Sequence, residues 1–230
     1  GVKGIEQVLI ATHYIPEKIE SFVGDGSRFG VQADYVYEDE PLGTAGALSL
    51  IDRPTQPTLV INGDILTRVD FRALLAFHRE QRALLTVGVR RYSFTVPYGV
   101  VRCDDSAVRA IEEKPDVKLM VNAGIYLLEP DVWDHIEPAQ RLDMTQLIRR
   151  LIETDCNGSR AVASFPVVEY WTDIGQHDDY EQAQRDIAEI QLTQHPQTQP
   201  PGNTQIGSDA DPDSAEQPQT SNNEEGGVAA

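Results

Sequence analysis

The residues of this chain best suited to chemistry are two aspartates that each follow an apolar stretch. Asp64 closes the run Val60-Ile61-Asn62-Gly63-Asp64, and Asp173 lies in Tyr170-Trp171-Thr172-Asp173-Ile174-Gly175. Open α/β sheets place their chemistry where a buried strand delivers a polar side chain at its carboxyl end. If the two carboxylates meet at one point, they form a hard-cation site suited to Mg²⁺ and phosphate.

Each aspartate also has an ordinary structural interpretation. Asp64 follows Gly63 and can serve as a turn aspartate that binds its own backbone. Asp173 precedes a predicted helix and can serve as its cap. For Asp64 taken alone, a structural role and a role in metal binding are about equally open, whereas for Asp173 taken alone the helix cap is the default interpretation.

A glycine-rich loop marks a second place where a ligand can lie. The loop at 38–46 leads from a predicted strand into a helix through Leu42-Gly43-Thr44-Ala45-Gly46. Gly43 and Gly46 allow the backbone to approach a ligand closely, and the start of the helix offers free N–H donors. Taken alone, the loop favours a simpler interpretation, an ordinary helix start capped by Thr44.

Two further runs carry residue types that bind phosphates and sugars. In Glu112-Glu113-Lys114-Pro115, Lys114 suits a phosphate and Glu113 suits paired sugar hydroxyls, although most such runs are solvated turns. In Asn122-Ala123-Gly124-Ile125-Tyr126, the amide can face a sugar or form a turn. The histidines form no spaced cluster in the sequence, and no Ser/His/Asp triad is visible.

These residues need elements that position them, and residues 1–190 alternate strand-like and helix-like stretches. Helical spacing of apolar residues, together with Pro16 and Asp70 as start signals, predicts helices at 16–23, 45–51, 70–81, 143–152 and 178–190. Short apolar runs predict strands at 6–11, 34–37, 58–62, 83–89, 99–102, 107–112, 122–128 and 160–164. Alternating βαβ units with a later antiparallel patch indicate an α/β sandwich around a mostly parallel sheet.

Charge and cysteine content exclude several classes of function. The 230 residues carry a formal net charge of −18, which argues against nucleic acid or an anionic membrane as the main partner. Cys103 and Cys156 are too few for a disulfide framework and are not spaced as zinc ligands, so we expect a reducing, cytoplasmic environment. The sequence contains no run of 18 apolar residues that would span a membrane.

Composition divides the chain into a domain at 1–190 and a polar tail at 191–230. The tail has no Lys, Arg or aromatic residue and is rich in Gln, Pro, Thr, Ser and Asp. Such a segment buries too little apolar surface to offset its ordering entropy, so we predict that it is disordered. The start lacks both a Met and a signal peptide, and the chain therefore looks like a piece of a longer protein.

The motifs are individually weak, but their order along the chain is specific. Over about residues 1–190 the chain resembles the sugar-1-phosphate nucleotidylyltransferases, also called nucleotide-sugar pyrophosphorylases. The motifs that carry this resemblance are Leu42-Gly43-Thr44-Ala45-Gly46, Asn62-Gly63-Asp64, Tyr98-Gly99-Val100, Glu113-Lys114-Pro115, Asn122-Ala123-Gly124-Ile125-Tyr126 and Trp171-Thr172-Asp173-Ile174-Gly175.

The resemblance implies a nucleotide-diphosphosugar transferase fold, a three-layer α/β sandwich around a mixed, mostly parallel sheet. It also implies a reaction: an oxygen of a sugar-1-phosphate attacks the α-phosphate of a nucleoside triphosphate, giving an NDP-sugar and pyrophosphate. One metal ion and one lysine would position and neutralise the two anions, so that no protein nucleophile or general base is needed. The nucleobase, the sugar and the oligomeric state, including a homo-oligomer, stay open.

By matching motif, the resemblance also implies a role for each site residue. Asp64 and Asp173 would hold the Mg²⁺ that bridges both substrates, and Lys114 would bind the sugar phosphate. The residues implied to line the sugar are Glu113, Asn122 and the backbone of Gly99 and Gly124. Those implied to face the nucleoside are Gly43, Thr44 and Gly46.

Two stretches are most similar to guanylyltransferase-type members of this family. They are Leu142-Asp143-Met144-Thr145 and Phe165-Pro166-Val167-Val168-Glu169-Tyr170-Trp171. This similarity suggests GTP and a mannose- or amino-sugar-1-phosphate as substrates, while the sequence by itself fixes neither the nucleobase nor the sugar.

The start of the chain departs from the family pattern. Family members begin with a strand, a Gly-x-Gly-Thr-Arg-Leu loop that cradles the triphosphate and a Pro-Lys pair, and this chain has none of them. The first βα unit of the fold is then missing. We therefore expect a sheet with an unpaired edge, and a chain that alone binds nucleoside triphosphate poorly and turns over little.

Two alternatives remain. The first is a non-catalytic regulatory paralogue, or an inactive fragment, that keeps only the sugar-phosphate half; a Gly-rich loop upstream would argue against it. The second is a metal-dependent glycosyltransferase. Such enzymes favour an Asp-x-Asp motif in mid-chain, whereas Asp209, Asp211 and Asp213 lie in the tail.

Overall fold

The computed structural model describes residues 4–154 and 161–194. Contacts divide the chain into two compact units, Gly1–Ile187 and Ala188–Ala230, and the side chains discussed below all belong to the first. Most of the predicted polar tail, from residue 195 to residue 230, lies outside the described residues.

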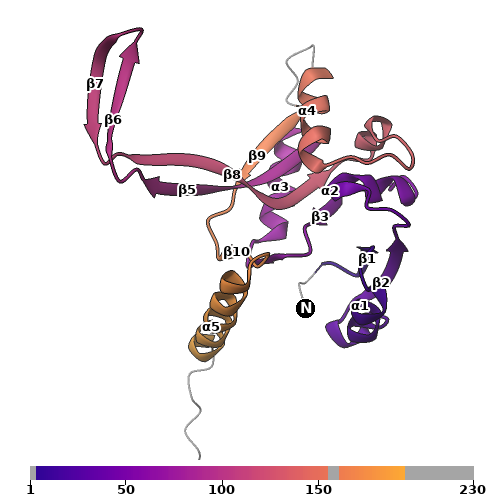
Figure 1. Ribbon diagram of the computed structural model, residues 1–230. Helices are drawn as coiled ribbons and strands as arrows, with labels where there is room; N and C mark the ends of the chain where they lie inside the picture. Colours follow the sequence, from indigo (N-terminus) through magenta and orange to yellow (C-terminus); the bar gives the residue numbers. More distant parts are fainter. Residues whose placement is uncertain (1–3, 155–160, 195–230) are drawn as a thin grey trace, which may run out of the picture. The chain divides into compact units, whose positions relative to one another are not determined.

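Strands and helices alternate along the first unit (Figure 1). The strands are β1 (Gln7–Thr12), β2 (Gln32–Tyr37), β3 (Thr58–Ile61), β4 (Ile65–Thr67), β5 (Leu85–Thr95), β6 (Gly99–Asp104), β7 (Ala107–Glu113), β8 (Asp116–Leu128), β9 (Val162–Pro166) and β10 (Trp171–Asp173). The α-helices are α1 (Pro16–Val23), α2 (Gly43–Gly46), α3 (Phe71–Gln81), α4 (Met144–Thr154) and α5 (His177–Gln194). Short 3-10 turns are η1 (Ser27–Phe29), η2 (Ala47–Leu50) and η3 (Pro130–His135).

The central sheet has the strand order β3-β8-β5-β9. Strands β3, β5 and β9 run in the same direction, and β8 runs against them between β3 and β5. A separate parallel pair is formed by β1 and β2. The mixed, mostly parallel sheet predicted from the sequence is therefore confirmed.

Apolar side chains on both faces of this sheet build the layers. On β8, Tyr126 and Leu128 belong to one buried cluster, whereas Ile125 and Leu127 belong to the other. Alternate residues of a strand point to opposite faces, so the two clusters lie on opposite sides of the sheet. The first cluster takes in Met144, Leu147 and Leu151 of α4, and the second takes in Leu74 of α3. This arrangement is the expected three-layer sandwich.

Two predicted helices show how local chemistry sets the element boundaries. Helix α3 begins as predicted, because the Asp70 carboxylate accepts the backbone N–H groups of Arg72 at 2.9 Å and Ala73 at 3.3 Å. The predicted helix at 45–51 is instead the short α2 followed by η2. Glycines at both ends of α2 weaken helical propensity, and the Ala45 N–H donates to the Leu142 carbonyl at 2.9 Å across the fold.

Strands β5 and β8 are longer than the sequence pattern predicts. They pair as far as Thr95 and Asp116, beyond a register shift between Val87 and Val89. Figure 1 shows β6 and β7 as a separate hairpin beyond the ends of these strands. We call residues 90–121, the outer part of the β5–β8 ribbon together with this hairpin, the arm. Its faces are mostly solvated, so it lacks the apolar pattern that marks a buried strand.

Among the ten strands that the structure describes, only β8 and β5 have a partner on each side, and the other eight pair on one side only. Strand β1 pairs with β2 alone, and β3 pairs with β8 alone. Every open sheet ends in such strands, so this topology does not test the unpaired edge expected from loss of the first βα unit, and that edge stays a prediction. None of the described helices is both long enough and apolar enough to cross a membrane.

Candidate functional site

Strands β4 and β10 bring Asp64 and Asp173 together. The two short strands pair antiparallel, with Asp173 opposite Ile65. Just beyond this ladder the Ile174 N–H donates to the Asp64 carbonyl oxygen at 2.8 Å. Asp64 and Asp173, far apart in the sequence, are therefore neighbours across one backbone ladder.

Their carboxylates face the same small space beside Gly175. A Cβ atom added to Gly175 would lie 3.0 Å from Asp173 Oδ1 and 3.6 Å from Asp64 Oδ2. Asp173 Oδ1 also accepts the Gly175 N–H at 2.8 Å, which fixes the side-chain rotamer, and both aspartates are exposed. Two converging hard-oxygen donors fit Mg²⁺, which takes one or two protein carboxylates and completes its shell with water and substrate phosphate.

No group of three or more His, Cys, Asp or Glu side chains suited to a metal occurs within residues 4–154 and 161–194. A cation held by the aspartate pair would therefore keep positions open for other ligands. An open coordination shell is the kind that can take a substrate.

A bulge in β8 places Asn122 and Gly124 near this pair. Gly124 has φ +67°, and its carbonyl accepts the Asn62 N–H at 2.9 Å, two residues before Asp64. The Asn122 amide holds the bulge: its Oδ1 accepts the Gly124 N–H at 3.0 Å, and its Nδ2 donates to the Tyr126 hydroxyl at 2.7 Å. Asn122 keeps one amide N–H outside these bonds and is exposed, so a ligand can reach it.

Tyr126 lies under the bulge and is 2 % exposed. Burial raises the pKa of its phenol, and the charge of Asp64 raises it further, whereas the Asn122 hydrogen bond lowers it. The hydroxyl therefore stays protonated at neutral pH and acts as a neutral support for Asn122. The sequence pattern placed Tyr126 in the strand but did not indicate this role.

The arm carries Gly99, Glu113 and Lys114 as a second group. Gly99 and Glu113 are cross-strand partners in the β6–β7 hairpin, and a Cβ atom on Gly99 would lie 3.1 Å from Glu113 Oε2. Lys114 follows directly, exposed and with φ +45°. The part of β8 from Asp116 to Asn122 rises about 20 Å, so the described conformation does not bring Lys114 to the two aspartates.

The third group, Gly43, Thr44 and Gly46, docks against the start of α4. The Thr44 hydroxyl accepts the Met144 N–H at 2.8 Å. Gly46 is buried, and a Cβ atom there would lie 2.6 Å from the Leu42 side chain. Close packing within the chain thus explains why a glycine occupies position 46. Thr44 is exposed, and the second lone pair of its hydroxyl is left for a ligand.

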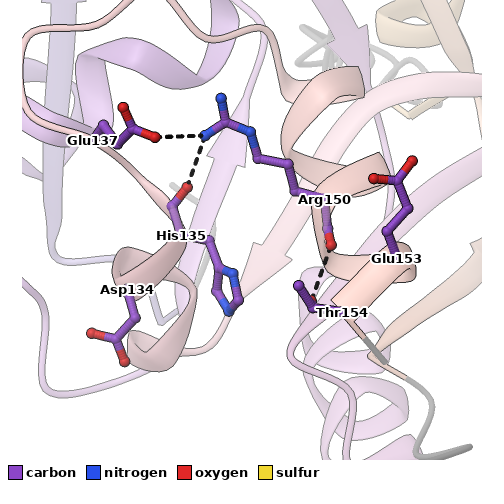
Figure 2. A pocket seen from close by; sticks show the side chains of 6 residues that line it. All are labelled: Asp134, His135, Glu137, Arg150, Glu153 and Thr154. Atoms are coloured by element: carbon purple, nitrogen blue, oxygen red, sulfur yellow. Dashed lines mark hydrogen bonds and ion pairs between the residues drawn. The ribbon is translucent and has the colours of Figure 1, made fainter. Parts of the chain in front are cut away.

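An open hollow of about 330 Å³ lies elsewhere, between η3 and α4 (Figure 2). Arg150 crosses it, donating to the His135 carbonyl at 3.3 Å and lying 3.9 Å from Glu137. None of the predicted site residues lines this hollow, and its acidic side chains outnumber the basic ones, which disfavours an anionic substrate. The lining residues are Asp134, His135, Glu137, Arg150, Glu153 and Thr154.

Comparison with protein families decides the classification. The family described as "Nucleotidyl transferase" matches residues 2–190. The chain belongs to this nucleotidyl transferase family. The resemblance drawn from the order of the motifs is thereby confirmed.

Named relatives within the family act on sugar-1-phosphates. The chain is 32% identical over 189 residues to a mannose-1-phosphate guanylyltransferase of Mycobacterium tuberculosis, covering 80% of this chain and 52% of that protein. It is 34% identical over 187 residues to a probable mannose-1-phosphate guanylyltransferase of Oryza sativa, covering 77% and 50%. A UTP–glucose-1-phosphate uridylyltransferase of Synechocystis is 32% identical over 209 residues, with 80% and 52% covered.

Solved structures share the nucleotidyl transferase fold. A putative glucose-1-phosphate thymidylyltransferase from Bacillus anthracis, crystallised with sucrose, superposes with a TM-score of 0.57 at 25% identity, covering 77% of this chain and 74% of that one. HddC from Yersinia pseudotuberculosis gives 0.55 at 22% identity, with 80% of both chains covered, and supports the fold alone. The present chain spans about half the length of the curated relatives it matches.

Proposed function

We propose that this chain supplies the metal- and sugar-phosphate-binding part of a sugar-1-phosphate nucleotidyltransferase. The single observation that carries the proposal is the convergence of Asp64 and Asp173 beside Gly175. A member of the nucleotidyl transferase family with two converging carboxylates has the donors that a nucleotidyl transfer through Mg²⁺ requires.

In the proposed reaction a phosphate oxygen of the sugar-1-phosphate forms a bond to the α-phosphorus of a nucleoside triphosphate. The bond from that phosphorus to the bridging oxygen of the β-phosphate breaks, and pyrophosphate leaves with the electron pair. The attacking oxygen is already ionised at neutral pH, so this chain needs to supply no general base. What its residues supply is position and charge.

Asp64 and Asp173 hold the cation in this proposal. When bound, Mg²⁺ supplies neutralisation of the phosphate charge between the two substrates. Asn122, braced by Tyr126, and the Gly124 backbone line the sugar next to the pair. Gly43, Thr44 and Gly46 lie toward the nucleoside.

Lys114, Glu113 and Gly99 complete the site only if the arm bends toward the aspartates. The β5–β8 ribbon has its register shift at Gly124 in β8, and a bulge of this kind bends the strand that carries it. In the proposal, Lys114 binds the sugar phosphate and Glu113 accepts sugar hydroxyls in this closed arrangement.

The relatives favour mannose-1-phosphate and GTP as substrates. Several of the similar proteins are named mannose-1-phosphate guanylyltransferases. The stretches at 142–145 and 165–171 resemble the same type, so we propose this pair of substrates ahead of glucose-1-phosphate with UTP.

Calorimetric titration with mannose-1-phosphate, in Mg²⁺ and again in excess chelator, tests the proposal. Binding is the readout because the proposal assigns metal and sugar-phosphate contacts, rather than turnover, to the residues of this chain. We expect binding in Mg²⁺ and its loss in chelator, with glucose-1-phosphate weaker than mannose-1-phosphate. Binding that is equal with and without the metal would contradict the proposed function.

The variant Lys114→Met tests whether the arm contributes to sugar-phosphate binding in addition to the metal. The variant should weaken mannose-1-phosphate binding at least about tenfold, because a charge-assisted contact to phosphate is lost. Lys118→Met, in the same arm and equally exposed, is the matched control and should bind as the unsubstituted protein does. Equal affinities for both variants would remove Lys114 from the site.

A further inference from the structure

Trp171 anchors the strand that carries Asp173. Its indole Nε1–H donates to the Ala123 carbonyl oxygen of β8 at 2.7 Å, and its ring packs against the buried cluster that contains Ala123 and Ile125. Side chains two residues apart in a strand point to the same face, so Trp171 fixes the face of β10 from which Asp173 projects.

Arg90 holds the same segment from β5. Its Nη1–H donates to the Glu169 carbonyl at 2.9 Å, and its guanidinium carbon lies 5.8 Å from the centroid of the Trp171 ring. That separation is within the range of a cation–π contact. One side chain of β5, at the base of the arm, therefore contacts two residues of the segment that leads into Asp173.

The ladder itself is too short to hold the aspartates in place. Strands β4 and β10 have 3 residues each, and they pair only with one another among the described strands. An isolated two-stranded pair is marginally stable even at greater length. The placement of Asp173 against Asp64 thus depends on contacts from outside the ladder, which Trp171 and Arg90 supply.

We propose that Arg90 and Trp171 are positioning residues of the divalent-cation site. Mg²⁺ demands near-ideal octahedral geometry, so a small displacement of one carboxylate weakens binding. Partners that orient metal ligands typically change metal affinity 10–100-fold when they are removed. The inference rests on the proposed function, because it requires the cation at Asp64 and Asp173.

The test is Mn²⁺ binding, read from the electron paramagnetic resonance of free Mn²⁺, in the full chain. Trp171→Phe keeps an aromatic ring at this position but loses the N–H donor and part of the indole's packing. Arg90→Lys keeps the charge and loses the guanidinium fork. Each variant should bind Mn²⁺ at least about tenfold more weakly than the unsubstituted protein.

Two control variants lose the same kinds of bond far from the aspartates. Trp133→Phe removes an indole bond to the Leu48 carbonyl of 3.1 Å. Arg150→Lys removes a guanidinium bond to the His135 carbonyl of 3.3 Å, drawn in Figure 2. Both controls should bind Mn²⁺ as tightly as the unsubstituted protein, with thermal unfolding recorded for all four variants.

Tryptophan fluorescence shows whether Mn²⁺ binds close to Trp171, independently of any change in stability. Trp171 is the sole tryptophan of Trp133→Phe, since the chain has two. Paramagnetic Mn²⁺ should quench its emission, whereas the emission of Trp133 in Trp171→Phe should be unaffected at the same occupancy.

The outcomes distinguish failure of the proposed function from failure of the positioning role of Arg90 and Trp171. If the unsubstituted protein binds no Mn²⁺, the proposed function fails and this inference fails with it. If the unsubstituted protein binds Mn²⁺ and both site variants match it, the inference alone is overturned. It is also overturned if the control variants lose as much affinity as the site variants, because the effect is then a general loss of stability.

Discussion

At the scale of single residues, one backbone conformation shapes the site. Gly124 occupies the left-handed region, which side chains other than glycine adopt at a cost. This conformation allows β8 to bulge, and the Gly124 carbonyl in the bulge accepts the N–H of Asn62, two residues before Asp64. Gly124 has no functional group on its side chain, yet its conformation brings Asn122 and Asp64 to the same end of the sheet.

Gly124→Ala should destabilise the fold by about 1–3 kcal/mol, from backbone strain together with crowding. A Cβ atom at this position would lie 2.9 Å from Asn62 Nδ2 and 3.0 Å from the Ile65 side chain. Gly63→Ala is the control, because its Cβ atom would meet nothing within 4 Å, and its cost should stay within about 0.5 kcal/mol. Urea unfolding measures both; equal costs would show that the bulge does not require glycine.

At the scale of elements, a buried polar contact ties α3 to the central sheet. His78 of α3 is fully buried, with Nδ1 2.7 Å from the Thr86 hydroxyl of β5 and Nε2 3.1 Å from the Glu129 carboxylate after β8. A carboxylate only accepts, so Nε2 carries the proton and Nδ1 of the neutral ring accepts from Thr86. This network fixes α3 over the same β8 strand that carries Asn122 and Gly124.

Stability should fall in acid because of His78. Burial lowers the pKa of its imidazole, and the charge of Arg79 lowers it further, whereas Glu129 opposes the shift. The unfolded state therefore binds the proton more readily, so the free energy of unfolding decreases as pH drops below about 6.5, by at most about 1.4 kcal/mol per pH unit for one proton. Urea unfolding at a series of pH values measures the slope.

His78→Gln should flatten this part of the pH profile. His13→Gln, which replaces a histidine at an exposed position in the same way, is the control for the substitution itself. A profile that is the same in the unsubstituted protein and in His78→Gln would assign the acid sensitivity to other groups.

At the scale of the whole molecule, the sequence predicts the layers better than the site. Helix 16–23 is confirmed at both ends, and Asp70 is confirmed as the cap of α3, because both carry local start signals. Strands β4 and β10 were not predicted, since strands of 3 residues have no detectable periodicity. Yet this pair joins Asp64 to Asp173, and it forms only when distant parts of the chain meet.

The length of the arm was missed for a related reason. Its strands are exposed on both faces, and the pairing of β5 with β8 stabilises them in place of burial. Motif order indicated Lys114 as part of the site, but order carries no information on distance. Only the three-dimensional structure shows that Lys114 on the arm lies away from the aspartate pair.

The net negative charge of the molecule bears on how an anionic substrate could bind. A chain with a net charge of −18 repels anionic substrates at long range, so local positive charge must offset this field at the site. Lys114 lies on the arm, away from the aspartates in the described conformation. In the proposed function, a divalent cation at Asp64 and Asp173 would therefore be the main attraction for phosphate.

The most direct measurement is Mn²⁺ binding by the unsubstituted chain, Asp64→Asn and Asp173→Asn. Asp25→Asn is the matched control, because Asp25 Oδ1 accepts the Ser27 N–H at 3.0 Å in the same kind of turn as Asp173 with Gly175. We expect one Mn²⁺ per chain, lost in both site variants and kept in the control. Retention of that Mn²⁺ by either site variant at unchanged affinity would contradict the proposed cation site.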